Sequence, residues 1–272
     1  MRGSGRVAGV PDVVELTRAL VAVDTVDRDE TTALDVLAPL LADAGFTLEL
    51  FEHAPGRGGL IAEWSPAGHA PPLCLSGHLD TVPMGAAAWS HDPLGGETAG
   101  DRLYGRGTSD MKGGVAAMVV AATRVAALPG PHRAGLRLVL TAAEETGCRG
   151  AAGLAARLRG RPSGPLLIAE PTANRVLHGH KGALWLAADT SGVTAHGSTP
   201  HLGENAIYPL ARAVTRLAGF DFGAPPHPIL GSPTLNVGTF EGGLNTNSVP
   251  DRARATIDVR TVIGQHHGGL TE

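Results

Sequence analysis

Apolar residues recur at helical spacing from Asp29 to Ala44, and Gly45 follows where such a helix would end. Beyond it, short apolar runs alternate with further helical stretches. Strands are expected at residues 46–51, 59–62, 72–78, 136–141 and 166–169, helices at 111–127 and 151–158, and a glycine-rich loop with a short hairpin at 84–106. This alternation predicts an α/β fold, a mainly parallel sheet with helices on both faces.

The pattern changes near His180. Strands are expected at residues 183–188, 234–240 and 252–260, with a helix at 204–217. We therefore expect two domains: a catalytic domain at residues 1–178 and a second domain at residues 179–272.

Composition favours a soluble enzyme. The 272 residues are 43% hydrophobic, and the net charge of −4 offers no basic surface for nucleic acid or an anionic membrane. The glycine-rich start, Met1–Val10, lacks the apolar core of a secretory signal, and no apolar stretch is long enough to span a bilayer. Cys74 and Cys148 are expected to be free thiols. The predicted location is the cytoplasm.

Four short motifs with acidic residues or histidine lie beside the predicted strands and helices. They are Ser76–Pro83, Gly107–Gly114, Glu144–Gly147 and Ala169–Thr172. Their positions predict that carboxylates and one imidazole gather at strand ends. Such groups are the usual ligands of catalytic zinc, which keeps one position for water. The motifs together predict a metallohydrolase site.

The spacing within the motifs suggests separate roles. His78 and Asp80 are two positions apart on an extended strand, so Asp80 is placed to accept the second ring N–H of His78 and fix its tautomer. Asp110 precedes a helix and is placed to bridge two metal ions. Glu144 and Glu145 are expected to point to opposite faces of their strand, so that one binds metal while the other takes a proton from water.

Each motif alone also has a simpler explanation. A His-x-Asp pair is commonly a satisfied hydrogen bond, Asp110 alone could cap the following helix, and a Glu-Glu pair is commonly plain surface. The four signals in this order are what favour a metal site.

The order and setting of the motifs resemble the cocatalytic zinc hydrolases that include acetylornithine deacetylase, succinyl-diaminopimelate desuccinylase, aminoacylase and glutamate carboxypeptidase. The resemblance covers nearly the whole chain and implies two divalent metal ions, Zn²⁺ foremost, with Co²⁺ or Mn²⁺ as substitutes. The implied ligands are His78, Asp110 and Glu170 for one ion, and Asp110 and Glu145 for the other. Glu144 is the implied general base, and Asp80 the residue that orients His78.

The resemblance also implies that the second region is an α+β, ferredoxin-like lid through which two chains form a homodimer. His196 resembles the histidine that reaches the partner subunit's site and stabilises the carbonyl oxygen as it becomes an oxyanion. Asn247 and Arg260 resemble substrate-binding positions, and a guanidinium suits the carboxylate of an amino acid. Two simpler explanations stay open: Asn247 shapes a turn beside Pro250, and Arg260 pairs with Asp258.

We expect a hydrolase of amide C–N bonds that removes the acyl group of an N-acyl amino acid. Glu at position 170 is similar to the deacylase and carboxypeptidase branches of the family. A metallo-carboxypeptidase or dipeptidase would use the same residues, and substrate profiling separates it from a deacylase. A noncatalytic homologue or fragment would hold metal without turnover. A nucleotide-binding protein is disfavoured because neither glycine-rich stretch contains a phosphate loop or a dinucleotide fingerprint.

The chain stops at Glu272, where the resemblance implies a further helix and strand and then the remainder of the catalytic domain. That remainder would carry the histidine of the second metal site. We therefore expect a truncated or split product whose second site lacks this histidine. Weak or no hydrolysis, exposed apolar surface and at most about one tightly held zinc per chain are the expected consequences.

Overall fold

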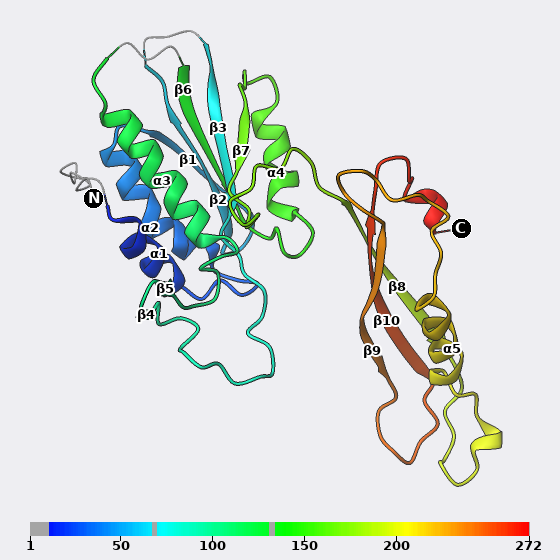
Figure 1. The fold of residues 1–272 in the computed structure, drawn as a ribbon. Coiled ribbons are helices and arrows are strands. Elements are labelled where there is room, and N and C mark those ends of the chain that lie inside the picture. Colours follow the sequence, from blue (N-terminus) through cyan, green and yellow to red (C-terminus); the bar gives the residue numbers. More distant parts are fainter. Residues whose placement is uncertain (1–10, 67–69, 131–133, 272) are drawn as a thin grey trace. The chain divides into compact units, whose positions relative to one another are not determined.

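The computed structural model describes residues 11–66, 70–130 and 134–271. The chain divides into two compact units, Met1–Asn174 and Arg175–Glu272 (Figure 1). The first unit contains a five-stranded sheet and the second a three-stranded sheet. The division lies next to the expected boundary at residue 178.

The sheet of the first unit has the order β1-β2-β6-β3-β7. Its strands are β1 (Thr47–Ala54), β2 (Arg57–Trp64), β3 (Ala70–His78), β6 (Ala134–Thr141) and β7 (Leu166–Ile168). β3 pairs in parallel with β6 and β7, whereas β2 is antiparallel to both β1 and β6. Four of the five strands thus run in one direction. The prediction of a mainly parallel sheet is confirmed.

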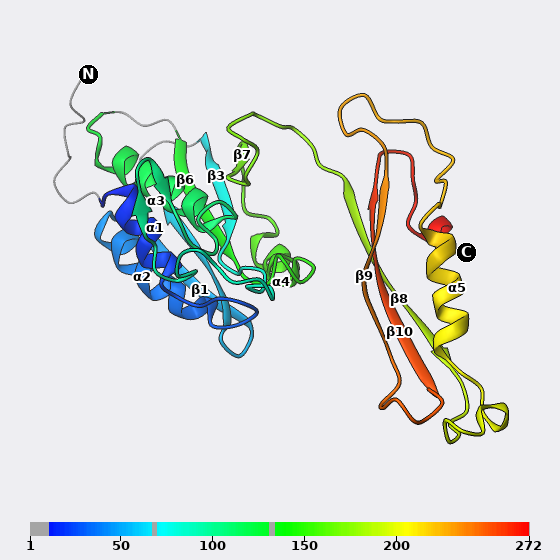
Figure 2. The ribbon, with the colours of Figure 1, turned by 60° about the horizontal axis from the view of Figure 1, so that its bottom comes forward.

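Helices cover both faces of this sheet, as predicted (Figures 1 and 2). One face is covered by α1 (Val13–Val21), α2 (Glu30–Asp43) and α3 (Lys112–Ala127), and the other by α4 (Arg149–Leu158). The alternation along β2 explains the arrangement. Leu60 and Ala62 belong to the core beneath the first three helices, while Ile61 packs with Leu154 of α4. Burying each large aliphatic side chain contributes about 1.5–3 kcal/mol to folding.

Helix α1 lies where the sequence analysis predicted no element. The Asp12 carboxylate accepts hydrogen bonds from the backbone N–H groups of Val14 (2.9 Å) and Glu15 (3.3 Å), which caps the start of the helix. Leu16 and Leu20, four positions apart, are buried in the core. With 9 residues the helix is too short to be stable alone, so its packing against α3 maintains it.

The loop between β3 and α3 contains the expected hairpin, formed by β4 (Thr98–Ala99) and β5 (Arg102–Leu103). Nearby, the guanidinium of Arg106 lies 5.0 Å from the centre of the Trp89 ring. The Trp89 indole N–H donates to the carbonyl oxygen of Met84 at 2.9 Å. These contacts hold the loop against its own ends.

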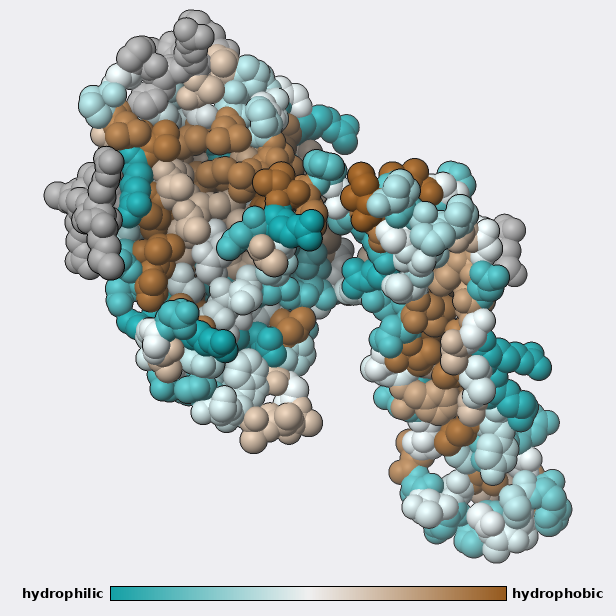
Figure 3. Space-filling view, viewed as in Figure 1, coloured by the Kyte–Doolittle hydropathy of each residue, from teal (hydrophilic) through white to brown (hydrophobic). Residues whose placement is uncertain are grey.

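Apolar side chains reach the surface of both units (Figure 3). In strand β7, Leu166, Leu167 and Ile168 are each at least half exposed. The expected exposure of apolar sheet surface is therefore observed at this strand. Within the described ranges, every helix falls short of the length and apolar content needed to cross a membrane.

The second unit is a two-layer α+β structure. Its antiparallel sheet has the order β8-β10-β9. The strands are β8 (Gly182–Ser191), β9 (Thr234–Gly242) and β10 (Arg252–Thr261), and α5 (Ile207–Leu217) packs on one face. Short 3₁₀ turns occupy Pro200–Leu202 and Gly268–Leu270. Alternate residues of the central strand β10, including Ala253 and Ala255, form a small core with Leu210 of α5.

Candidate metal centre

The candidate site lies at one edge of the parallel part of the first sheet. His78 is the last residue of β3, and Glu170 follows the end of β7 at Ile168. Glu144 and Glu145 follow the end of β6 at Thr141. Parallel strands direct their carboxyl ends to one edge, so residues far apart in sequence converge there. Asp110 reaches the same place from the segment before α3.

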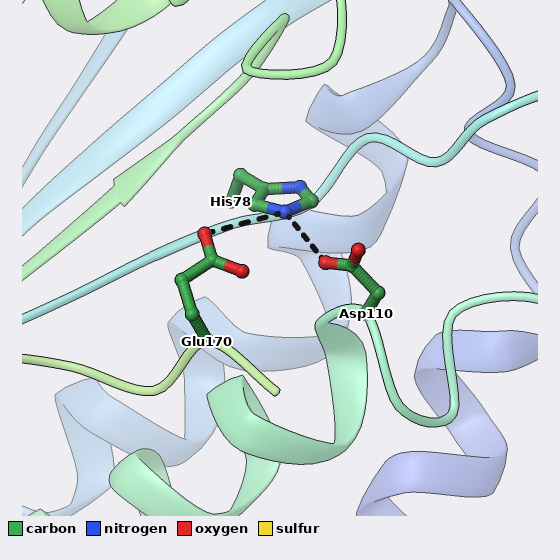
Figure 4. Close-up of side chains that lie close together, drawn as sticks. All are labelled: His78, Asp110 and Glu170. Atoms are coloured by element: carbon green, nitrogen blue, oxygen red, sulfur yellow. Dashed lines mark hydrogen bonds and ion pairs between the residues drawn. The ribbon is translucent and has the colours of Figure 1, made fainter. Parts of the chain in front are cut away.

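His78, Asp110 and Glu170 form one group of potential ligands, whose nearest nitrogen and oxygen atoms all lie within 4.8 Å of one another (Figure 4). Nε2 of His78 is 3.2 Å from Oδ1 of Asp110 and 3.8 Å from Oε1 of Glu170. The imidazole is buried, whereas the side chains of Asp110 and Glu170 are 52% and 40% exposed. The group is therefore anchored in the fold on one side and open to solvent on the other.

His78, Glu144 and Glu145 form a second group with the same closeness of ligand atoms. The expectation that the two glutamates point to opposite faces of a strand was wrong, because β6 ends at Thr141 and both residues lie in the turn that follows. Both carboxylates approach His78 as a result. Asp110 and Glu145, the expected ligands of a second ion, lie in different groups.

Asp80 orients His78 in a different way from the one expected. Nδ1 of His78 lies 3.0 Å from the main-chain carbonyl oxygen of Asp80 and 3.5 Å from its carboxylate. A carbonyl oxygen only accepts, so Nδ1 carries the proton and donates it. In the neutral ring, the lone pair then belongs to Nε2, the atom that faces Asp110 and Glu170. This tautomer is the one that allows Nε2 to bind a metal ion.

The Asp80 carboxylate instead fixes the turn that carries the two glutamates. Its Oδ1 accepts the backbone N–H of Glu144 at 3.0 Å, and its Oδ2 accepts that of Glu145 at 2.9 Å. Burial opposes ionisation of this buried carboxyl group, but the His78 contact and the two N–H donors hold the pKa of Asp80 below its usual value. Asp80 thus connects the histidine of one motif to the glutamates of another.

The electrostatics of the cluster favour a bound cation. Burial lowers the pKa of His78, but the surrounding carboxylates outweigh this effect and raise the pKa to about 11. Burial and the charge of Asp110 raise the pKa of Glu145 to about 7. Burial also raises the pKa of Glu170, while the hydrogen bond with His78 keeps the pKa of Asp110 low. Carboxylates crowded in this way repel one another unless positive charge lies between them.

The donor set fits a divalent transition metal. One imidazole nitrogen and four carboxylates are available within the two groups. Such mixed nitrogen and oxygen ligands suit Zn²⁺ and also accept Co²⁺ or Mn²⁺. The partial exposure of Asp110 and Glu170 leaves the solvent access that a hydrolytic site requires.

The other three predicted site residues lie in the second unit. His196 forms an antiparallel bridge with Ser248, and the backbone N–H of Gly197 donates to the carbonyl oxygen of Asn247 at 2.7 Å. The loops that carry His196 and Asn247 are therefore neighbours, although the two residues are distant in sequence. Their roles remain predictions.

Arg260 pairs with Asp258 in the second unit, as the simpler explanation for this residue expected. Arg260, on β10, donates from Nε to Oδ2 of Asp258 at 2.9 Å. The indole N–H of Trp185 donates to the other oxygen of Asp258, also at 2.9 Å. The Asp258 carboxylate thus holds both side chains on the exposed face of the sheet.

Lys112 received no role in the sequence analysis. Its side chain is fully buried, and Nζ donates to the carbonyl oxygen of Val23 at 2.7 Å. Thr25, two residues after Val23, donates from its hydroxyl to the carbonyl oxygen of Leu79 at 2.7 Å. Lys112 therefore ties the segment after α1 beneath the loop that follows His78. In the sequence, only its position two residues after Asp110 indicated that Lys112 could support the site.

Comparisons with known proteins identify the family of the chain. The sequence pattern of peptidase family M20/M25/M40 matches residues 74–182, and that of a peptidase dimerisation domain matches residues 178–270. A succinyl-diaminopimelate desuccinylase of Cereibacter sphaeroides is 36% identical over 261 residues, which cover 92% of this chain and 67% of that protein. The chain thus spans about two thirds of the length of this relative.

Two solved structures share the fold. An M20 family metallo-carboxypeptidase from Sulfolobus solfataricus superposes with a TM-score of 0.77 at 18% identity, covering 96% of this chain and 74% of that chain. A dinuclear metal-binding peptidase of the M20 family from Bacillus subtilis superposes with a TM-score of 0.53 at 16% identity, covering 95% of this chain and 65% of that chain.

Proposed function

The chain belongs to peptidase family M20/M25/M40 and is a metal-dependent hydrolase, and we propose that its reaction removes the acyl group from an N-acyl amino acid. The observation that carries this proposal is the convergence of His78, Asp110, Glu144, Glu145 and Glu170 at one sheet edge. The desuccinylase name of the Cereibacter sphaeroides relative supports an N-succinyl amino acid among the substrates.

In the proposed reaction, Glu144 acts as the general base. It accepts a proton from the attacking water and returns it to the leaving amine. The Asp80 carboxylate fixes the backbone of Glu144 and Glu145 and so restricts where the base can lie. Water reaches the site through its exposed side, where Asp110 and Glu170 lie.

Two divalent ions are proposed, with Zn²⁺ as the native metal. His78, Asp110 and Glu170, which form one group, would hold one ion. Asp110 and Glu145, although they lie in different groups, would contribute to the second. When bound, the ions would polarise the amide carbonyl and lower the pKa of water. Because Nδ1 of His78 keeps its proton for the carbonyl oxygen of Asp80, the proton that a bound ion would displace is the one on Nε2.

The second unit is proposed to complete the site within a homodimer. His196 would donate a hydrogen bond to the carbonyl oxygen as negative charge develops on it. Arg260 would bind the carboxylate of the amino acid, and Asn247 would contact the substrate beside it. We also place the enzyme in the cytoplasm, because Cys74 and Cys148 are both free thiols.

Turnover of a substrate panel tests the proposal. The purified chain, supplied with Zn²⁺, Co²⁺ or Mn²⁺, is assayed on N-acetyl, N-succinyl and N-formyl amino acids and on dipeptides. The control is the Glu144→Gln variant with the same metal. Deacylation by the wild-type chain, but not by the Glu144→Gln variant, supports the proposal. Hydrolysis of dipeptides without deacylation would assign a carboxypeptidase or dipeptidase, and retained metal without any turnover would assign a noncatalytic homologue or fragment.

A further inference from the structure

His196 is hydrogen-bonded within its own turn. Its Nδ1 lies 2.7 Å from the hydroxyl oxygen of Ser198 and receives the backbone N–H of Ser198 at 3.2 Å. A backbone N–H only donates, so Nδ1 must offer its lone pair. The proton of the neutral ring then resides on Nε2. Within the described part of the chain, no hydrogen bond reaches Nε2.

The Ser198 hydroxyl reinforces this choice. A hydroxyl both donates and accepts, so alone it would be compatible with either tautomer. Here the 3.2 Å contact from the backbone N–H of the same residue favours an unprotonated Nδ1, and the hydroxyl, in the shorter 2.7 Å contact, is left to donate to that atom. Both donors of Ser198 therefore point to one lone pair. Together they set the tautomer and the direction of the imidazole ring.

The backbone around the ring is fixed by further hydrogen bonds. The N–H of Thr199 donates to the carbonyl oxygen of His196 at 2.9 Å, and that of Val249 donates to the carbonyl oxygen of Ala195 at 2.8 Å. A Cβ atom at Gly197 would lie only 3.0 Å from the carbonyl oxygen of Asn247, so glycine permits this close approach. The N–H of Ser198 is thus held in place by the neighbouring loop.

We propose that Ser198 is a positioning residue that commits His196 to the Nε2–H tautomer. His196 then presents a hydrogen-bond donor to an oxygen atom, and in the neutral state it offers no lone pair at Nε2 for a proton or a metal ion. The inference deepens the proposed function, on which it rests only for the identity of that oxygen as the substrate carbonyl.

His227 provides an internal reference, because its Nδ1 also accepts backbone N–H groups, from Ile229 at 3.2 Å and Leu230 at 3.1 Å. Neither of these donors is a hydroxyl, so His227 isolates the effect of backbone donors. Nδ1 of His180, in contrast, lies 2.8 Å from the carbonyl oxygen of Lys181 and must carry the proton. The chain therefore contains references for both tautomers.

Nitrogen NMR of histidine-labelled, metal-free full chain tests the tautomer directly, at a pH where imidazole is neutral. The His196 signals are assigned by their loss in His196→Gln. We expect an unprotonated Nδ1 and a protonated Nε2 in the wild type and in Ser198→Thr, and a weaker hydrogen bond at Nδ1 in Ser198→Ala. Ser198→Asp, whose carboxylate only accepts, should move the proton to Nδ1. A proton on Nδ1 in the wild type, or identical His196 signals in all variants, would overturn the proposal.

Kinetics test the consequence separately. Ser198→Asp should lower kcat by about 10²-fold with little change in KM, the effect of losing one donor to a developing oxyanion. Ser198→Thr should retain the activity of the wild type. Unchanged kcat in a Ser198→Asp variant with a reversed tautomer would contradict the role assigned to the Nε2–H donor. If the wild type shows no turnover, the proposed function fails while the NMR result still decides the tautomer.

Discussion

The two units use histidine in opposite ways. His78 in the first unit is buried, and its Nδ1 faces a main-chain carbonyl oxygen. His196 in the second unit is exposed, and its Nδ1 faces a main-chain N–H. In the neutral ring, the first arrangement leaves a lone pair at Nε2, which suits a metal ion, and the second leaves a proton there, which suits an oxygen acceptor. The polarity of the groups that face Nδ1 therefore decides what each imidazole can do.

The supporting structures also differ. The His78 loop rests on a core between helices and a sheet covered on both faces, and buried Asp80 links it to the glutamate turn. The His196 loop rests on a thin two-layer unit and depends on hydrogen bonds between exposed loops. Substitutions of the proposed metal ligands around His78 should accordingly alter metal binding, whereas those around His196 should alter turnover alone.

The largest expected effect is on the general base of the first unit. Glu144→Gln removes the proton acceptor but keeps a side chain of the same size, so kcat should fall by about 10²- to 10⁴-fold. Metal content, measured by elemental analysis, should remain that of the wild type. The matched variant Glu145→Gln should instead lose metal. An active Glu144→Gln enzyme would contradict this division of labour between adjacent glutamates.

In the second unit, loss of a functional side chain should also lower turnover without changing metal content. His196→Ala removes a proposed donor to the developing oxyanion, so kcat should fall by about 10²- to 10³-fold with metal content unchanged. If two chains share each site, mixing His196→Ala with Glu144→Gln subunits should restore part of the activity. Complete absence of restored activity in a verified mixed dimer would place His196 outside a shared site.

A smaller effect is expected when the link between His78 and the glutamates is altered. Asp80→Asn turns an amide N–H₂ group toward the backbone N–H of Glu144 or Glu145, so one hydrogen bond is lost. Metal affinity, measured by competition with a chelating dye, should weaken by about 10- to 100-fold, as for other groups that support ligands. Asp101→Asn, in the exposed β4–β5 hairpin, is the control. Equal metal affinities of the two variants would mean that Asp80 does not support the metal ligands.

Much of this arrangement could be predicted from the sequence, because the apolar runs before His78 and Glu144 identify buried strands and place both motifs at one edge. The hydrogen-bond partners could not. Spacing alone favoured the carboxylate of Asp80 as the partner of His78, but the main-chain carbonyl oxygen of Asp80 lies closer to the ring. Which of the two groups lies closer depends on backbone torsion angles, which residue spacing does not give. Helix α1 escaped prediction because packing, more than its short pattern, maintains it.

Lys112 allows a test of how firmly the first unit is supported near its metal site. Burial lowers the pKa of Lys112 to about 8 from its ordinary 10.5, although Asp24 and Glu30 act the other way. Because the pKa of Lys112 is lower in the folded state, the charged side chain decreases the free energy of unfolding. This cost is fully present below about pH 8. The cost fades as the pH rises toward the unfolded value, where both states lose the proton.

The free energy of unfolding of the wild type should therefore increase relative to Lys112→Met as the pH rises. Between about pH 7.5 and about pH 9.5 the gain should be about 2 kcal/mol, the amount that the pKa difference implies. Denaturant unfolding of both metal-free proteins at each pH measures it. Lys181→Met, which removes the only other lysine of the chain, serves as the control. If the free energies of unfolding of the wild type and Lys112→Met differed by the same amount at each pH, Lys112 would not be desolvated beneath the His78 loop. The contrast between a firmly supported first unit and a second unit that depends on its loops would then weaken.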